Sequence, residues 1–447
     1  MKFEGKLREV ELGLIFYPQM RILNGVMINM KIAMIGWEYP PFKAGGLATH
    51  CYGLTRSLSG KNVKVYFFMP KTKHAANSDR PNLVITEVGE TEIFPYDRPE
   101  DKALAGNFFE EVHRYNQLVV AKVKAVAKAE GKFDFIHAHD WLTMEAATIL
   151  KEDLGIPMVL TIHSTEYDRS GWLNPNQWFI DIEKEGMEKA DGIIAVSHFT
   201  KRVIVEKYGI NPEVISVVHN AVYPVPEGKK QKIVLFLGRL TIQKGAEFFL
   251  KAARKVLDYE PDVRFVVAGV GDMLPRLIDQ AVDLGISNRV IFTGRLTEDE
   301  VKHIYGISSV YIMPSVSEPF GITALEAISA GTPTIASKTA GVCETFNNCL
   351  KVDFWDSDEM ASKIISLLRY ESLRRTLTEN GKQEIELFTW DNVAGKTIDV
   401  YNGMDIARLE KQLKEREKIY KWNQKLASRA YEPTLTLKTK KMRKSKC

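Results

Sequence analysis

Short apolar runs alternate with longer amphipathic segments from Met30 onward. In the first half of the chain the runs cover residues 31–35, 63–69, 135–138, 158–162 and 192–196. Each run is almost continuously apolar, which is typical of parallel strands buried on both faces. Amphipathic segments such as 107–129 and 178–190 lie between the runs and predict helices. The pattern therefore predicts a parallel sheet with helical crossovers.

The stretch 223–232, YPVPEGKKQK, interrupts this alternation with two prolines, a glycine and a charge run, a composition typical of a linker. A second alternation follows, with strands predicted at 233–237, 263–268, 290–293, 309–313 and 334–336. We therefore predict an α/β fold with two doubly wound, Rossmann-like domains. Ligands bind such sheets at the carboxyl ends of the strands, so the cleft between the domains is the expected site.

The 447 residues exceed one ordinary core and fit two domains with appendages. The net charge of +4 is uneven, because residues 408–447 hold 14 Lys and Arg against 4 Glu, which is +10 and leaves −6 for the rest. Basic tails bind nucleic acid or anionic surfaces in some proteins. We favour a solvated helix with a frayed end, and expect no nucleic-acid partner.

Cysteines stand at 51, 343, 349 and 447 and show neither metal-ligand spacing nor a disulfide framework. This usage is typical of a reducing cytosol and predicts a cytoplasmic protein. No run of about 18 uncharged apolar residues occurs, so no membrane span is expected. The N-terminal segment lacks the cleavage site of a signal peptide.

The segment SVSEPFGITALEAISAGTP, residues 315–333, places two glutamates around the predicted start of a helix. Glu318 lies in the turn before the helix, and Glu326 lies inside it. The helix N-terminus between them, at Gly321, is a natural seat for phosphate. Acceptor groups on both sides of a phosphate seat suit a nucleotide-sugar.

Two cations follow the first strand after the linker, in VLFLGRLTIQKG. Arg239 leaves the strand end, and Lys244 precedes the glycine that opens a helix. Such a pair can clamp a diphosphate. A surface strand end with solvated charges is the alternative interpretation.

The first strand runs into GWEYPPFKAGGLATH, where Gly45 and Gly46 follow Lys43 just before a helix. Backbone amides beside a lysine can hold a phosphate or a sugar oxygen. A tight turn that needs glycine for positive φ is equally consistent. The spacing does not match a dinucleotide fingerprint.

The motif HAHDW ends a strand, with His137 and His139 on one face and Asp140 at the tip. Two histidines are metal-ligand types. No third ligand is evident, so a polar cleft lining is favoured over a metal site. His163 ends the next strand, at the same expected edge.

Taken in order, these motifs resemble those of the retaining glycosyltransferases of GT-B architecture, and most closely the short archaeal glycogen synthases and family 4 type enzymes. The resemblance covers about residues 30–404 and uses five motifs: K-x-G-G-L at 43–47, HAHDW at 137–141, TIH at 161–163, GRL-x3-KG at 238–245, and the paired glutamates. FTWDNVAGKTIDVY, residues 388–401, resembles the helix that crosses back onto the N-terminal domain.

The resemblance implies a role for each motif residue. Arg239 and Lys244 would bind the donor diphosphate, Glu326 the ribose hydroxyls, and Glu318 the donor sugar. His163 would touch the sugar near its reactive carbon, and Asp140 would line the acceptor side. The remaining donor-binding residues would be Lys43, Gly45, Gly46, Gly321, Ile322, Thr323, Thr339 and Gly341, with backbone amides of 339–341 near the phosphate.

The same resemblance divides the chain into six parts. They are an N-terminal extension or start-site artefact (1–29), an acceptor-side domain (30–222), the linker (223–232), a nucleotide-sugar-binding domain (233–387), a crossover helix (388–413) and a basic tail (414–447). Two positions depart from starch synthases, which usually carry threonine at Ala44 and cysteine at Phe320. The EPFG form here is common in trehalose, sucrose and sugar-phosphate synthases.

We therefore expect a retaining glucosyltransferase that uses UDP- or ADP-glucose and an α-glucan acceptor, with no cofactor and no metal. A small glucoside product, of the trehalose or sucrose phosphate type, is an alternative. A nucleotide-sugar epimerase is a second class, and a non-catalytic binding protein a third. The sequence does not predict the oligomeric state, and a homo-oligomer is one alternative.

Overall fold

The computed structural model describes residues 22–23, 26–27, 30–41, 45–71, 78, 80–89, 108–404, 418 and 422. The compact unit that holds both large sheets ends at Val400. A two-stranded hairpin, β1 (Ile22–Leu23) with β2 (Val26–Met27), precedes them and was not expected. Most of the predicted extension, Lys43, Ala44 and almost all of the predicted basic tail lie outside the described residues.

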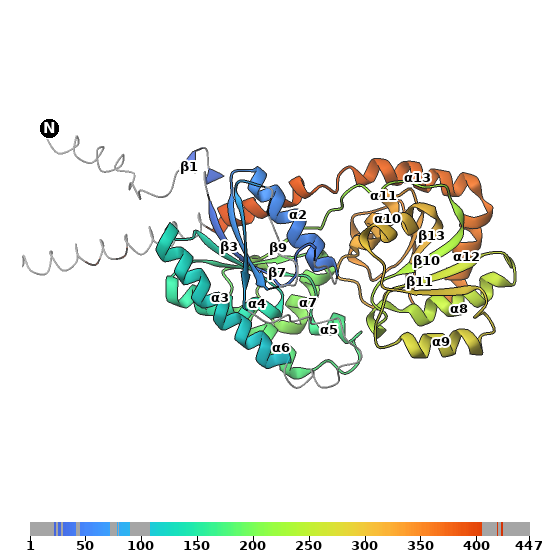
Figure 1. The fold of residues 1–447 in the computed structure, drawn as a ribbon, viewed down its shortest axis with the longest axis horizontal. Helices are drawn as coiled ribbons and strands as arrows, with labels where there is room; N and C mark the ends of the chain where they lie inside the picture. The colour runs from blue at the N-terminus through green and yellow to red at the C-terminus, as the bar shows by residue number, and fades with distance from the viewer. Residues whose placement is uncertain are drawn as a thin grey trace, which may run out of the picture. The chain divides into compact units, whose positions relative to one another are not determined.

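The first sheet has seven strands, all parallel, in the order β5-β4-β3-β6-β7-β8-β9 (Figure 1). Five of them match the predicted runs within two residues at either end: β3 (Lys31–Ile35), β4 (Lys64–Pro70), β6 (Phe135–His139), β7 (Met158–Ile162) and β8 (Gly192–Ala195). The two outer strands, β5 (Leu83–Val88) and β9 (Ile215–Val217), were missed. Most residues of these outer strands are only partly buried, so neither strand needs a continuous apolar run.

Helices cover the first sheet on both sides, and α3, α4 and α6 run together along one of its faces (Figure 1). Buried residues of these helices and of α7 join strand residues in one apolar core. The bounds are α2 (Gly46–Gly60), α3 (Phe108–Glu130), α4 (Trp141–Leu154), α5 (Glu166–Arg169), α6 (Gln177–Lys189) and α7 (His198–Tyr208). The helix predictions at 107–129 and 178–190 agree within one residue at each end.

The second sheet has six parallel strands in the order β12-β11-β10-β13-β14-β15. The strands are β10 (Gln231–Leu237), β11 (Arg264–Ala268), β12 (Val290–Gly294), β13 (Ser308–Met313), β14 (Thr334–Ser337) and β15 (Leu350–Val352). The last of these, an edge strand, was missed. Strand β10 includes the last two residues of the predicted linker, and the first of them, Gln231, pairs with Ser308 of β13. The prediction of two doubly wound parallel domains is confirmed.

Helices of the second domain are α8 (Ala246–Leu257), α9 (Leu274–Asp283), α10 (Glu298–Ile307), α11 (Ile322–Ser329), α12 (Ser357–Arg369) and α13 (Glu371–Ile385). A further helix covers residues 390–404. Its start contacts α2, because Ser57 Oγ donates to Asp391 Oδ1 over 2.8 Å. The ring of Trp390 lies 5.7 Å from that of His50. Among the described helices, none is long and apolar enough to span a bilayer.

Candidate active site

A cavity of about 690 Å³ lies where the carboxyl ends of four second-domain strands meet the start of α2. This volume falls within the range of small-molecule binding sites. Eight of the residues predicted from sequence line it: Gly45, Gly46, Arg239, Lys244, Glu318, Ile322, Thr323 and Glu326. The structure therefore brings Gly45 and Glu326, which are about 280 positions apart in the chain, to the same cavity.

Lys244 and Glu318 form an ion pair in this cavity, with Lys244 Nζ 2.8 Å from Glu318 Oε2. Ser315 Oγ donates to the same carboxylate oxygen over 2.9 Å. Lys244 ends a short 3-10 turn that closes at Gly245, whose φ is 68°. A Cβ at Gly245 would come within 2.1 Å of a backbone oxygen, so glycine is required there. The turn thus holds the ammonium against the loop that carries Glu318.

Glu326 lies in α11 and accepts a hydrogen bond from the hydroxyl of Tyr305 on α10, over 3.1 Å. Burial, and then the charge of Glu326, raise the pKa of Tyr305 well above its ordinary value. The tyrosine therefore stays protonated and serves as a donor, and the glutamate remains an acceptor. Tyr305 was missed from the sequence, because nothing in its local pattern marks it.

The start of α11 faces the cavity through Ile322 and Thr323. Gly321 precedes the helix with a φ of 104°, and no side chain caps the helix. A Cβ at Gly321 would lie 2.9 Å from the methyl carbon of Met313. The amides of an uncapped helix start favour an anion. The sequence-based interpretation of this turn as a phosphate seat therefore has the necessary geometry.

The backbone amides of residues 339–341 do not point to a ligand as expected. Thr339 N donates to Ser337 Oγ over 3.3 Å and Ala340 N to the Ser337 carbonyl over 3.0 Å. Gly341 N donates to the Glu318 carbonyl over 2.9 Å. The prediction of phosphate-binding amides here is therefore corrected: the Gly341 amide fastens the Glu318 loop, and the other two amides close a local turn at Ser337.

The glycines of the first-domain loop also differ from expectation. Gly45 is extended, with φ −171°, and its amide donates to Glu38 Oε2 over 3.2 Å. Gly46 opens α2 and would place a Cβ 3.7 Å from Ile322 of the second domain. The positive-φ interpretation is wrong for both glycines. A Cβ at Gly45 would meet nothing within 4 Å, and one at Gly46 would be in ordinary van der Waals contact with Ile322.

Asp140 does not line the cavity but turns toward backbone. It precedes α4 with a φ of 55°, and its Oδ1 accepts from the amide of His163 over 2.6 Å. Burial raises the pKa of Asp140 to about 7, against the lowering effect of that hydrogen bond. This carboxyl fixes the backbone at His163, which does not line the cavity either, and the acceptor-side role of Asp140 stays a prediction.

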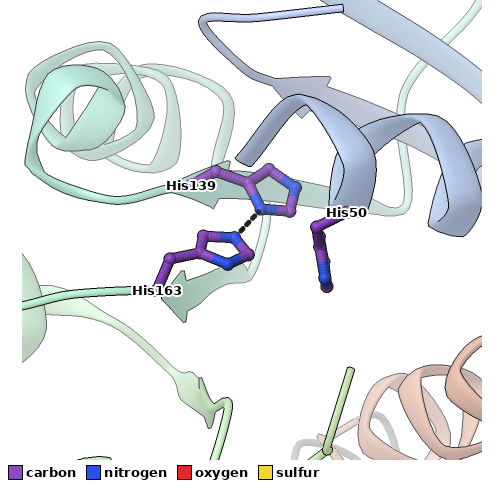
Figure 2. Close-up of side chains that lie close together, drawn as sticks. All are labelled: His50, His139 and His163. Carbon is purple, nitrogen blue, oxygen red and sulfur yellow. Dashed lines mark hydrogen bonds between the residues drawn. The ribbon is translucent and has the colours of Figure 1, made fainter. Parts of the chain in front are cut away.

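His163 belongs to a cluster with His50 and His139 (Figure 2). The ring of His137 stacks on that of His139. His139 Nδ1 and His163 Nε2 are hydrogen-bonded over 3.1 Å. Burial lowers the pKa of His50 to about 4, that of His137 to about 3, and those of His139 and His163 well below the ordinary value. All four imidazoles are therefore neutral near pH 7. His50 was missed because it lies mid-helix, with no motif around it.

Direct polar contacts that were not predicted join the domains beside the cavity. Ser317 Oγ donates to the buried Asp168 Oδ1 over 2.6 Å. Glu344 accepts from the amides of His198 and Phe199, at the start of α7, over 2.8 and 2.5 Å. Ser317 is next to Glu318 in the chain, and Glu344 follows the 339–341 segment. The loop that carries Glu318 is thus attached to the first domain.

Comparison with known proteins agrees with this arrangement. Residues 44–224 match the model for Glycosyltransferase Family 4, and residues 223–384 match the model for Glycosyl transferases group 1. An uncharacterized glycosyltransferase of Methanocaldococcus jannaschii is 32% identical over 399 residues, which are 83% of this chain and 98% of that protein. A glycogen synthase of Mycobacterium tuberculosis is 27% identical, covering 83% of this chain and 94% of that one.

Solved structures have the same fold. The sucrose-phosphate synthase of Thermosynechococcus elongatus has a TM-score of 0.68 at 22% identity, over 85% of this chain and all of that one. Anabaena HepE, solved with UDP and glucose, has a TM-score of 0.63 at 17% identity, over 84% of this chain and all of that one. With its two parallel sheets and its family 4 and group 1 halves, the chain belongs to the GT-B glycosyltransferases.

Proposed function

We propose that this glycosyltransferase transfers glucose from UDP- or ADP-glucose to an α-glucan acceptor, with retention at the anomeric carbon. The observation that carries the donor assignment is the Lys244–Glu318 pair, set beside Arg239 in a ligand-sized cavity. A sugar diphosphate needs a cation and a helix start for its phosphates and a carboxylate for its hydroxyls. The glycogen synthase of M. tuberculosis, which aligns with most of the chain, supports the glucan acceptor.

The difficult step is the separation of the diphosphate from a sugar that becomes cationic. Arg239, Lys244 and the start of α11 all face the cavity. Preorganised positive groups stabilise charge that develops on a leaving group. Lys244 would exchange its contact with Glu318 for a phosphate oxygen as the donor enters. Glu318 would then accept hydroxyls of the donor sugar. No step of this mechanism is assigned to a metal or a cofactor.

Glu326 is proposed to bind the ribose. Its carboxylate faces the cavity and is held by the Tyr305 hydroxyl over 3.1 Å. A carboxylate has several acceptor sites, so the tyrosine contact is compatible with hydrogen bonds to the ribose hydroxyls. A site that hydrogen-bonds substrate hydroxyls strongly rejects analogues that lack them.

Retention through a covalent intermediate would need a carboxylate at the anomeric carbon. Glu318 is the candidate that the motif offers, but its proposed role is to accept hydroxyls of the donor sugar away from the anomeric carbon. We therefore favour attack on the same face as the departing diphosphate, guided by that group. His163 is proposed to contact the sugar near the reactive carbon, and Asp140 holds the backbone at this histidine.

A panel of nucleotide-sugars, each offered with glycogen, glucose or glucose 6-phosphate, tests this proposal. We expect turnover with UDP- or ADP-glucose on glycogen, with α-linked product. Turnover on glucose or glucose 6-phosphate alone would replace the glucan acceptor with a small one. A sample with donor and no acceptor is the control for epimerisation, and isomerised donor there would contradict the transferase assignment.

A further inference from the structure

Four histidines lie together at the carboxyl ends of β6 and β7; His50, His137 and His139 are buried and His163 is half-buried. His50 comes from α2, His137 and His139 come from β6, and His163 follows β7. The His50 ring centroid lies 4.4 Å from that of His163 and 5.4 Å from that of His139. Figure 2 shows the rings of these three side chains grouped from three separate elements. Tertiary structure alone brings them together.

Hydrogen bonds account for only part of the polar atoms in this cluster. His137 Nε2 contacts Thr161 Oγ1 over 2.7 Å, and His50 Nδ1 contacts Asn220 Oδ1 over 2.7 Å. Within the described part of the chain, no donor or acceptor reaches the buried Nε2 atoms of His50 and His139. Buried polar atoms nearly always have a partner. The unpartnered Nε2 of His50 indicates a ligand that takes a nitrogen lone pair at this end of the cluster.

We propose that His50, His139 and His163 bind one divalent transition-metal ion of the zinc class. One ring nitrogen from each residue lies within 4.8 Å of the other two. Tetrahedral zinc, with Zn–N distances of about 2.0–2.1 Å, sets its ligand nitrogens roughly 3.3 Å apart. His139 Nδ1 and His163 Nε2 are already 3.1 Å apart. A small side-chain rotation of His50 completes the set.

The surroundings match such a site in two respects. Asn220 Oδ1 accepts from the Nδ1–H of His50, which leaves the lone pair of this residue on Nε2, the atom without a protein partner. Hydrogen bonds of this kind orient metal-binding histidines. An all-imidazole set suits zinc, copper, nickel or cobalt, whereas magnesium and calcium require oxygen ligands.

Metal binding would have a functional consequence, and this consequence rests on the proposed function. His163 cannot contact the donor sugar through a ring nitrogen that is bound to a metal ion. An occupied site would therefore inhibit transfer, and the donor and the metal would compete for His163. The metal site itself does not depend on which sugar is transferred.

Metal binding is tested on the full chain, stripped with a chelator and titrated with Zn²⁺ and with Co²⁺ as a spectroscopic probe. We expect one ion per chain and a visible Co²⁺ spectrum typical of tetrahedral nitrogen ligation. His50→Ala and, separately, His139→Gln should each weaken binding at least tenfold. His113→Ala is the matched control, because this histidine is 64% exposed on α3. Thermal unfolding of each variant shows whether it is folded.

Binding to His50→Ala equal to that of the wild-type chain overturns the proposal, as does a wild-type chain that retains no ion. If the wild-type chain retains no ion, the His139–His163 contact is only a hydrogen bond between neutral rings. Inhibition is measured separately: Zn²⁺ should reduce wild-type transfer at least tenfold, while His50→Ala keeps most of its own activity. Bound metal without inhibition refutes the competition for His163. Absence of any transfer would instead contradict the proposed function, since metal content is measured without substrate.

Discussion

Lys244 Nζ lies 2.8 Å from Glu318 Oε2, and both side chains face the same cavity. The pair is largely buried, since the two side chains are 20% and 9% exposed. Charges removed from water need partners. Each group thus compensates the charge of the other and holds it in place until a ligand competes for them. A diphosphate would take the cation, and sugar hydroxyls would take the carboxylate, so the ion pair prepares both halves of a donor site.

Replacing Lys244 with alanine should lower kcat by about 10²–10³-fold, because a preorganised positive group is lost from the leaving phosphate. Initial rates at saturating donor measure this effect. Lys338→Ala is the control, since this lysine is paired with Asp353 at the surface and is 51% exposed. Near-normal turnover of Lys244→Ala would remove the diphosphate clamp from the mechanism.

Tyr305→Phe should raise the KM for the donor roughly tenfold and leave kcat nearly unchanged. The substitution removes the hydroxyl that holds Glu326 and keeps the buried ring. A hydrogen bond to a charged group is worth about 1.5–3 kcal/mol, and about 1.4 kcal/mol is a factor of ten in affinity. Tyr259→Phe, at a 61% exposed position, is the control. A fall in kcat at constant KM would contradict the assignment of Glu326 to the ribose.

Much of the fold could be predicted because parallel strands buried on both faces leave a strong sequence signal. Strands β3 and β7 have the predicted bounds. The strands that were missed, β5, β9 and β15, lie at the sheet edges, where a strand needs less apolar sequence. Edge position depends on the order of strands in the sheet, which local periodicity does not contain.

The donor half of the site was predictable because its groups lie in continuous motifs at strand ends, such as Arg239 with Lys244. Hydrogen-bond direction was not predictable. The amides of 339–341 and the carboxyl of Asp140 lie in motif segments, yet they bind other parts of the protein. His50 and Tyr305 reach the site region through packing of separate helices, and no spacing along the chain indicates this.

Lys230 provides a test of pH-dependent stability. Burial lowers its pKa to about 8. Its ammonium donates to the carbonyl of Ala330 over 2.9 Å, just after α11. Between about pH 8 and the ordinary lysine value near 10.4, the unfolded chain holds this proton and the folded chain does not. The contribution of Lys230 to the free energy of unfolding therefore rises with pH between these two values.

Lys230→Met removes this titration. The free energy of unfolding of the wild-type protein minus that of the variant should increase between about pH 8 and 10. Urea unfolding at several pH values measures the difference. Lys229→Met is the neighbouring control, at an exposed position. A difference that stays constant or falls over the window would show that Lys230 keeps its ordinary pKa.

Gly53 tests the contact of the last helix with the first domain. A Cβ at this position would lie 2.1 Å from Trp390 Cδ2, and Trp390 is buried beside His50. Gly53→Ala should therefore displace the indole and destabilise the protein by about 1–3 kcal/mol, as overpacking does. Gly395→Ala is the matched control, since Gly395 is helical and has open space where its Cβ would be. That variant should be stabilised by about 0.5–1 kcal/mol. Thermal unfolding compares the two, and equal midpoints would mean that Trp390 can leave α2 without cost.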